Sequence, residues 1–220
     1  MRHEFALRMD MMNVLIVANG DAPSKRLLDR LKANSDLVIA ADGGANTLFD
    51  LGHAGFTIIG DLDSVRPEVL ASIPEDLQLR VEDQDTCDLE KAINHCANLR
   101  ADRILITGAT GGRLEHTLTS MSLLYKYAGL LRMRIISDSE EIVAVPVAAE
   151  IAGEPGDIVS LVTMETAKSV TLTGVKWPLK NATMEPGSHG VSNVLTSAKG
   201  KLTVGRGCVL LIHSRTISED

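Results

Sequence analysis

Short apolar runs alternate with helix-like segments through the first two thirds of the chain. Each run ends in Gly, Asp, Asn or Ser, and the predicted strands lie within residues 13–20, 36–44, 56–64, 77–83, 103–112 and 133–138. Apolar residues at helical spacing predict helices over residues 23–33, 45–52, 66–72, 88–100 and 115–130. Strands that alternate with helices indicate crossover units, so we expect a mainly parallel, Rossmann-like sheet with flanking helices. Ligands bind such sheets beyond the carboxyl ends of the strands, where these polar residues fall.

The pattern changes after about residue 138. Short strand candidates follow one another without a helical segment between them, at residues 141–146, 148–153, 157–164, 169–175, 201–205 and 208–214. Gly, Pro, Asn and Ser separate these runs, which is typical of an antiparallel sandwich or a partial barrel. We therefore expect two domains, an α/β domain over residues 1–138 and a small all-β domain over residues 139–220.

Composition narrows the class of protein. The chain has 220 residues, 45% hydrophobic and 23% charged, as in ordinary globular domains. Its net charge of −7 argues against non-specific binding to nucleic acid or to an anionic membrane surface. No apolar stretch approaches the roughly 20 residues of a membrane span.

The cysteines and the start of the chain indicate in which cellular compartment the protein is expected. Cys87, Cys96 and Cys208 are odd in number and widely spaced, which favours reduced thiols over a disulfide framework. Polar residues interrupt the opening stretch "MRHEFALRMDMMNVLIVANG", so it does not read as a signal peptide. We expect a cytoplasmic protein.

The stretch "IIGDLDSV" at residues 58–65 places two aspartates at the end of an apolar strand. Strand geometry predicts that the side chains of Asp61 and Asp63 point the same way, with Cα atoms about 6.6 Å apart. Two carboxylates that close repel one another unless a cation or a proton lies between them. The alternative is a polar turn, since Gly, Asp and Ser are common in turns.

Two further loops combine glycines with a helix start. In "AADGGANTLFD", Asp42 precedes Gly43 and Gly44, which would allow a phosphate to approach backbone N–H groups. A double glycine is more often only a turn. The loop "TGATGGRLEHTL" holds Gly111, Gly112, Arg113, Glu115 and His116. The arginine offers a forked cation for phosphate, whereas a plain hydrogen-bonding role at the helix start is the alternative for the histidine.

A fourth loop, "EDQDTCDLEKA", is strongly acidic. It carries Asp83, Asp85, Asp88 and Glu90. Helix capping would explain Asp85 or Asp88 but does not require four acids. Carboxylates with glycine turns suit Mg²⁺, which uses one or two carboxylates plus substrate phosphates. The chain has no P-loop, no G-x-G-x-x-G fingerprint and no Cys/His cluster of zinc spacing. The loops therefore predict Mg²⁺-dependent handling of a nucleotide polyphosphate.

In this order the loops resemble the thiamine pyrophosphokinase family. The family strings D-G-G-A-N, G-D-x-D-S, D-x-D-x-T-D and G-G-R-x-D-H are matched at residues 42–46, 60–64, 83–88 and 111–116. In the second domain, "GVKWPL" at 174–179 and "GVSN" at 190–193 are similar to family motifs. Two positions depart from the pattern, because Cys87 stands where threonine is usual and Glu115 where aspartate is usual.

The resemblance implies transfer of the pyrophosphoryl group of ATP to the hydroxyl of thiamine, giving thiamine diphosphate and AMP. It implies a homodimer whose thiamine sites lie between subunits. The implied Mg²⁺ ligands are Asp61, Asp63 and Asp85, and Asp42 and Asn46 belong to the implied nucleotide or metal loop. The other implied nucleotide or phosphate contacts are Gly43, Gly44, Gly111, Gly112, Arg113 and His116. Glu115 is expected near the reacting groups, and Asp85 or Asp88 could accept the hydroxyl proton. The implied thiamine contacts are Trp177, Ser192 and Asn193, with cation–π stacking on Trp177.

Other functions stay open at this stage. The departures at Cys87 and Glu115 are compatible with another small alcohol as acceptor, such as a hydroxymethylpterin. A non-catalytic nucleotide-binding regulator could keep the same fold, although it would not need every acidic loop. A structural role would make the acids a solvated face and Trp177 a half-buried packing residue of the β domain.

Overall fold

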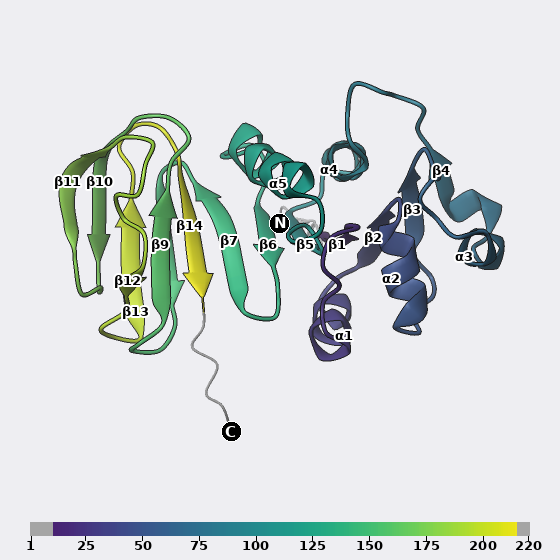
Figure 1. The fold of residues 1–220 in the computed structure, drawn as a ribbon, viewed down its shortest axis with the longest axis horizontal. Coiled ribbons are helices and arrows are strands. Elements are labelled where there is room, and N and C mark those ends of the chain that lie inside the picture. The colour runs from purple at the N-terminus through teal and green to yellow at the C-terminus, as the bar shows by residue number, and fades with distance from the viewer. Residues whose placement is uncertain (1–10, 215–220) are drawn as a thin grey trace, which may run out of the picture.

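A computed structural model describes residues 11–214 as a mixed α/β fold with two sheets (Figure 1). The first ten residues, which are the first half of the opening stretch considered as a signal peptide, and the last six residues lie outside the described residues. The ten strands of the larger sheet are, in spatial order, β12 (Asn193–Val194), β9 (Ile158–Val162), β14 (Val209–Ser214), β7 (Glu140–Val145), β6 (Met133–Ile136), β5 (Arg103–Thr107), β1 (Asn13–Val17), β2 (Leu37–Ala41), β3 (Thr57–Gly60) and β4 (Gln78–Arg80). The smaller sheet has the order β11 (Leu179–Met184), β10 (Ala167–Thr173), β13 (Lys199–Thr203) and β8 (Ala148–Ala152).

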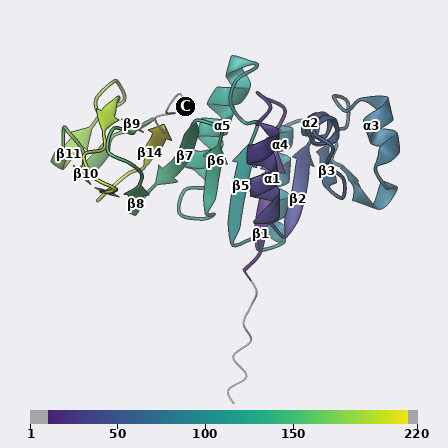
Figure 2. The same cartoon turned by 90° about the horizontal axis from the view of Figure 1, so that it is seen from below.

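The strands from β6 to β4 pair in parallel and carry helices on both faces. The helices are α1 (Lys25–Ala33), α2 (Gly44–Asp50), α3 (Pro67–Ser72), α4 (Asp88–Asn98) and α5 (Leu114–Lys126), with a short 3₁₀ turn at Glu75–Leu77. Apolar residues of α4 and α5 share one core cluster, and those of α1, α2 and α3 share another on the opposite face. Figure 2 shows α1 running alongside the strands, in front of the part of the sheet between β5 and β2. The predicted α/β arrangement is confirmed.

Strand β1 illustrates why these runs are apolar without alternation. Val14 and Ile16 belong to the cluster under α4 and α5, while Leu15 and Val17 belong to the cluster under α1 to α3. All four are fully buried. A parallel strand covered by helices on both faces needs apolar side chains at every position, whereas a strand with one wet face does not.

The β half of the molecule, formed by strands β7 to β14, is a sandwich, which is one of the two forms expected from the sequence. Residues of β7, β9 and β14 face residues of the four-stranded sheet across one core, which includes Val159, Leu161, Val170, Leu172 and Leu202. The larger sheet runs through both halves, because β6 pairs in parallel with β5 and antiparallel with β7. The division proposed at residue 138 therefore falls between two hydrogen-bonded neighbours, and it stays a prediction.

Two local predictions differ from the structure. Strand β3 ends at Gly60, and Leu62 adopts a left-handed φ of 70°, so Asp61 and Asp63 lie in a turn rather than on an extended strand. Strands β11 and β12 were not expected. Strand β11 reads "LKNATM" with a left-handed Asn181, and β12 has only two residues, so neither carries an apolar strand pattern.

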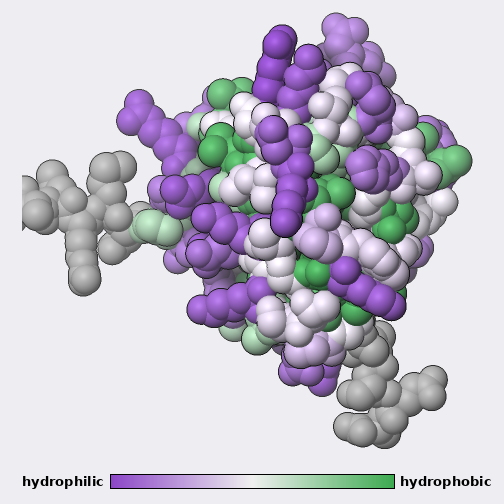
Figure 3. Space-filling view, turned by 90° about the vertical axis from the view of Figure 1, so that its left-hand side faces the viewer, coloured by the Kyte–Doolittle hydropathy of each residue, from purple (hydrophilic) through white to green (hydrophobic). Residues whose placement is uncertain are grey.

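Polar side chains dominate the end of the molecule formed by the β half. Figure 3 shows this end, where hydrophobic residues appear as separate small areas among hydrophilic ones. Within residues 11–214, no helix is both long enough and apolar enough to cross a membrane.

Candidate active site

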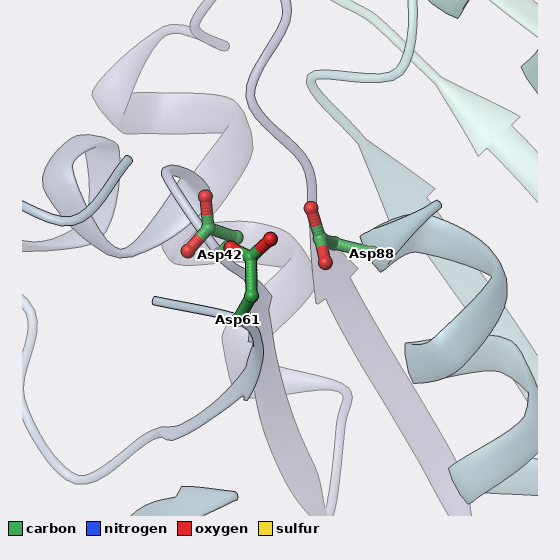
Figure 4. A group of neighbouring side chains, drawn as sticks. All are labelled: Asp42, Asp61 and Asp88. Atoms are coloured by element: carbon green, nitrogen blue, oxygen red, sulfur yellow. The ribbon is translucent and has the colours of Figure 1, made fainter. Parts of the chain in front are cut away.

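Three aspartates from separate parts of the chain meet near the carboxyl ends of β2 and β3. Asp42 directly follows β2, Asp61 directly follows β3, and Asp88 is the first residue of α4. Each offers one carboxylate oxygen, and these oxygens lie within 4.8 Å of one another (Figure 4). Three negative charges at this spacing repel one another unless a cation or protons reduce the charge. The three side chains therefore form a candidate site for a divalent cation with oxygen ligands.

Asp42 is the most enclosed of the three, with 3% of its surface exposed. Its Oδ2 accepts a hydrogen bond from the Ser64 N–H at 3.2 Å, while Oδ1 is buried without a hydrogen-bond partner among the described residues. The pKa of Asp42 is raised overall, mainly because the carboxyl group is buried. The charges of Asp88 and Asp61 also raise it, whereas the hydrogen bond from Ser64 lowers it. A buried carboxylate oxygen needs a partner, so this oxygen fits a cation ligand.

Lys91 stabilises Asp88 from within α4. Its Nζ donates to Asp88 Oδ1 at 3.0 Å, and 5% of its side chain is exposed. Burial works to lower the pKa of Lys91, but the bond to Asp88 and the charges of Asp88, Asp61 and Asp83 raise it overall. Lys91 is therefore an ammonium at neutral pH, and it forms an ion pair with Asp88.

A cavity of about 340 Å³ opens beside the three aspartates. The predicted site residues that line it are Asp42, Asp61, Asp63, Asp88, Gly111, Arg113 and His116. Arg113 Nε donates to Glu115 Oε1 at 2.5 Å, and both side chains are exposed. The Glu115 backbone N–H and the Arg113 side chain lower the pKa of Glu115. The lining of the cavity thus includes both carboxylates and an arginine, a combination that suits a metal-bound polyphosphate.

Asp63 and Asp85 lie apart from the three-aspartate group. Asp63 lines the cavity but is exposed, and its Oδ1 accepts from the Ser64 hydroxyl at 2.9 Å. Asp85 is exposed on the turn before α4, where its N–H donates to Asp83 Oδ1 at 2.9 Å, and among the described residues it is not one of those lining the cavity. Their assignment as metal ligands stays a prediction.

The predicted nucleotide-binding residues of the stretch at 40–50 hold neighbouring segments of the protein in place. The Asn46 side chain accepts from the Arg66 N–H at 3.0 Å and donates to the Ser64 carbonyl at 2.9 Å, so it fastens the loop that carries Asp61. A Cβ at Gly44 would lie 2.0 Å from the Val17 carbonyl oxygen, and one at Gly43 would meet the Asn19 side chain. These glycines let α2 approach β1 closely.

The predicted thiamine residues lie in the β half, and the described lining of the cavity does not include them. Trp177 is 55% exposed, with Lys176 Nζ 4.6 Å from its ring centroid. Ser192 is exposed and adopts a left-handed φ of 59°. Asn193 is buried, and its side-chain amide bonds to the backbone of Trp177.

Comparison with known proteins decides the family. One family model, described as thiamin pyrophosphokinase, catalytic domain, matches residues 28–136, and another, described as its vitamin B1 binding domain, matches residues 147–209. The Bacillus subtilis thiamine pyrophosphokinase is 30% identical over 224 residues, covering 93% of this chain and 99% of that protein. The chain belongs to the thiamine pyrophosphokinase family. Two solved structures are similar as well.

The crystal structure of the thiamine pyrophosphokinase from Bacillus subtilis has a TM-score of 0.81 at 28% identity and covers 93% of this chain and 100% of that one. The thiamin pyrophosphokinase from Geobacillus thermodenitrificans has the same TM-score and identity, with 94% and 99% covered. The three aspartates fall in the part of the chain matched by the catalytic-domain model, and Trp177 falls in the part matched by the vitamin B1 binding model.

Sequence reasoning missed several residues of the site. Asn19 and Gly20 line the cavity after β1, where the polar end of "NVLIVANG" was a usable signal. Thr119 and Ser120 also line it from α5, and only their position one helical turn after His116 pointed to them. The role of Lys91 was not predicted, although it stands three residues after Asp88 in the stretch "EDQDTCDLEKA", a spacing at which helix side chains meet.

Proposed function

We propose that this protein transfers the pyrophosphoryl group of ATP to the hydroxyl of thiamine. In this step the hydroxyl oxygen bonds to the β-phosphorus of ATP while the bond from that phosphorus to the α,β-bridging oxygen breaks. The products are thiamine diphosphate and AMP, and the hydroxyl proton is released. The observation that carries the proposal is the convergence of Asp42, Asp61 and Asp88 beside Arg113, in a chain of this family.

Asp42, Asp61 and Asp88 would hold Mg²⁺ through carboxylate oxygens. The unpartnered Oδ1 of Asp42 supports this choice. When bound, Mg²⁺ would neutralise phosphate oxygens and so offset the charge of ATP. Asp61 belongs to the Mg²⁺ ligand set implied by the resemblance, and Asp42 to the implied nucleotide or metal loop. Asp88 joins them in this proposal, and Asp63 and Asp85 stay predicted ligands.

The remaining residues act by position and charge. Phosphoryl-type transfer needs orientation and charge stabilisation rather than covalent work by the protein. Arg113 is a cavity-lining guanidinium suited to a phosphate oxygen pair. Lys91 holds one carboxylate oxygen of Asp88 through its ammonium group. Asp85 or Asp88 is the proposed acceptor of the hydroxyl proton.

Trp177 is the proposed stacking surface for thiamine, which is a flat aromatic cation. Because it does not line the cavity of its own chain, thiamine would have to meet Trp177 of a second copy, and we propose a homodimer on this ground. Three free cysteines agree with the expected cytoplasmic location, which also stays a proposal.

The test is the nucleotide product. Purified protein with ATP and Mg²⁺ would be incubated with thiamine, with a hydroxymethylpterin, and with neither, and the nucleotides would be separated by chromatography. We expect AMP only with thiamine, in equal amount to thiamine diphosphate. AMP with the pterin alone would support the other acceptor, and ADP would mean that a single phosphoryl group is transferred. ATP binding that EDTA abolishes, without turnover, would indicate a regulator.

A further inference from the structure

The segment that carries Trp177 is fastened to the segment that contains β12. Val175 forms an antiparallel bridge with Leu195. The Lys176 N–H donates to the Val194 carbonyl at 2.8 Å, and the Thr196 N–H donates to the Gly174 carbonyl at 2.9 Å. These backbone bonds run as far as Lys176, one residue short of the tryptophan.

The side chain of Asn193 extends this ladder to Trp177. Its Oδ1 accepts the Trp177 N–H at 3.0 Å, and its Nδ2 donates to the Trp177 carbonyl at 2.6 Å. Oδ1 also accepts the Val194 N–H at 2.9 Å. Only 4% of Asn193 is exposed, so both ends of a buried amide are engaged by backbone groups.

The neighbours of both residues favour this arrangement. The Ser192 N–H donates to Ser160 Oγ at 2.9 Å. Ser192 has a left-handed backbone conformation and directly precedes the buried Asn193. Pro178 follows Trp177 and has no N–H to offer a further backbone bond. The indole itself is 55% exposed, so the bonds that hold it act on its backbone and not on the ring.

We propose that Asn193 is a positioning residue, which fixes the backbone of Trp177 so that its exposed indole is held ready for thiamine. The inference rests on the proposed function, and it replaces the direct thiamine contact that the sequence motif suggested for Asn193. An exposed aromatic side chain binds a planar ligand more tightly when its orientation is already restricted, because less conformational entropy is lost on binding.

The first experiment measures tryptophan fluorescence and does not depend on enzymatic activity. Trp177 is the only tryptophan of the chain, so the anisotropy of tryptophan fluorescence reports on it alone. Asn193→Ala is expected to lower that anisotropy, and Asn193→Asp, which keeps the acceptor but loses the donor to the Trp177 carbonyl, to lower it less. Val170→Ala, a truncation in the core of the same half, is the matched control and should leave it unchanged. Anisotropy at the wild-type value in folded Asn193→Ala would overturn the proposal.

The second experiment is a double-mutant cycle on the KM for thiamine. Asn193→Ala is expected to raise this KM about tenfold with little change in the KM for ATP, which corresponds to about 1.4 kcal/mol. In a Trp177→Ala background the same change should have an effect below about twofold, because Asn193 acts through Trp177. An undiminished effect in that background would mean that Asn193 contacts thiamine itself. Absence of turnover in the unmodified protein would count against the proposed function, and the anisotropy result would still decide the role of Asn193.

Discussion

At the scale of single residues, asparagine amides hold two loops by bonding to backbone groups. Asn46 fastens the turn after β3, and Asn193 fastens the segment of Trp177. An asparagine side chain carries a donor and an acceptor, so it can replace a pair of backbone partners where a strand ends. In both cases the amide fixes the backbone of a segment that lies more than ten residues away along the chain.

The three-aspartate group predicts which carboxylates are needed for turnover and for metal binding. Asp88→Asn is expected to lower turnover at least about 100-fold, the range found when one charge-stabilising group is lost from an active site. Asp85→Asn, a matched change three residues earlier on an exposed segment, tests metal binding outside the three-aspartate group, and its turnover shows whether Asp85 accepts the hydroxyl proton. Mn²⁺ binding followed by electron paramagnetic resonance should weaken in the first variant and persist in the second. The reverse order of effects would restore Asp85 as the ligand.

The cysteines predict a selective thiol reaction. Burial raises the pKa of Cys96 to about 12 and that of Cys208 to about 11, so at pH 8 both thiols stay protonated and unreactive. Cys87 is only partly buried and lines the cavity. A thiol reagent should modify Cys87 first in the folded protein and all three cysteines in denaturant, as read by mass spectrometry. Slower labelling with ATP and Mg²⁺ would connect Cys87 to the bound nucleotide, whereas equal labelling of the folded cysteines would contradict the burial.

At the scale of elements, the approach of α2 to β1 sets the place of Asp42. The helix begins at Gly44, directly after the loop that holds Asp42. Because a Cβ at Gly44 would overlap the Val17 carbonyl, only glycine allows the helix to start this close to the sheet. Asp42 itself has a left-handed φ of 44°, a conformation that aspartate tolerates better than most residues.

Gly44→Ala separates two opposing expectations. Helix propensity alone would stabilise the protein by up to about 1 kcal/mol, since alanine is the better helix former. The close contact with β1 predicts instead a loss of about 1–3 kcal/mol, the cost of overpacking, and a lower melting temperature. Thr47→Ala in the same helix is the control and should be nearly neutral. A higher melting temperature for Gly44→Ala would mean that α2 can move away from β1 at little cost.

At the scale of the whole molecule, one sheet joins the two halves. Ile142 of β7 and Leu210 of β14 pack in the same cluster as Leu123 and Leu124 of α5. The Tyr125 hydroxyl lies 3.1 Å from Thr163 Oγ1, in hydrogen-bond contact across the same boundary. Contacts of this kind tie the α/β half to the sandwich, so we expect the halves to lose structure together.

Unfolding in denaturant tests this expectation, because each half has its own signal. Every α-helix within residues 11–214 lies in the α/β half, so circular dichroism at the helix band follows that half, whereas Trp177 fluorescence follows the sandwich. The two transitions should share one midpoint, as two-state unfolding requires. Separate midpoints would show that the halves fold as independent domains with a boundary near residue 138.

The sequence by itself determined the order and kind of most elements and the loops that hold the chemistry. Apolar runs of the α/β half are continuous because both faces of a parallel sheet are buried, and the same burial makes them easy to recognise. Asp61, Asp88 and Arg113 were named because carboxylates, glycines and an arginine follow strands in a fixed order. The family also followed from those loops together with the motifs at residues 174–179 and 190–193, since the six occur in the family's order along most of the chain.

Only the tertiary structure decided which carboxylates converge and how the halves are joined. Asp42 and Asp88 meet Asp61 because β2 and β3 are neighbours and α4 begins beside their ends, and no spacing along the chain encodes that contact. The pairing of β6 with β7 and the hold of Asn193 on Trp177 are likewise contacts between segments whose local patterns are unremarkable. Local periodicity reports which side of an element is buried, whereas the partner that covers it is chosen by the packing of the complete chain.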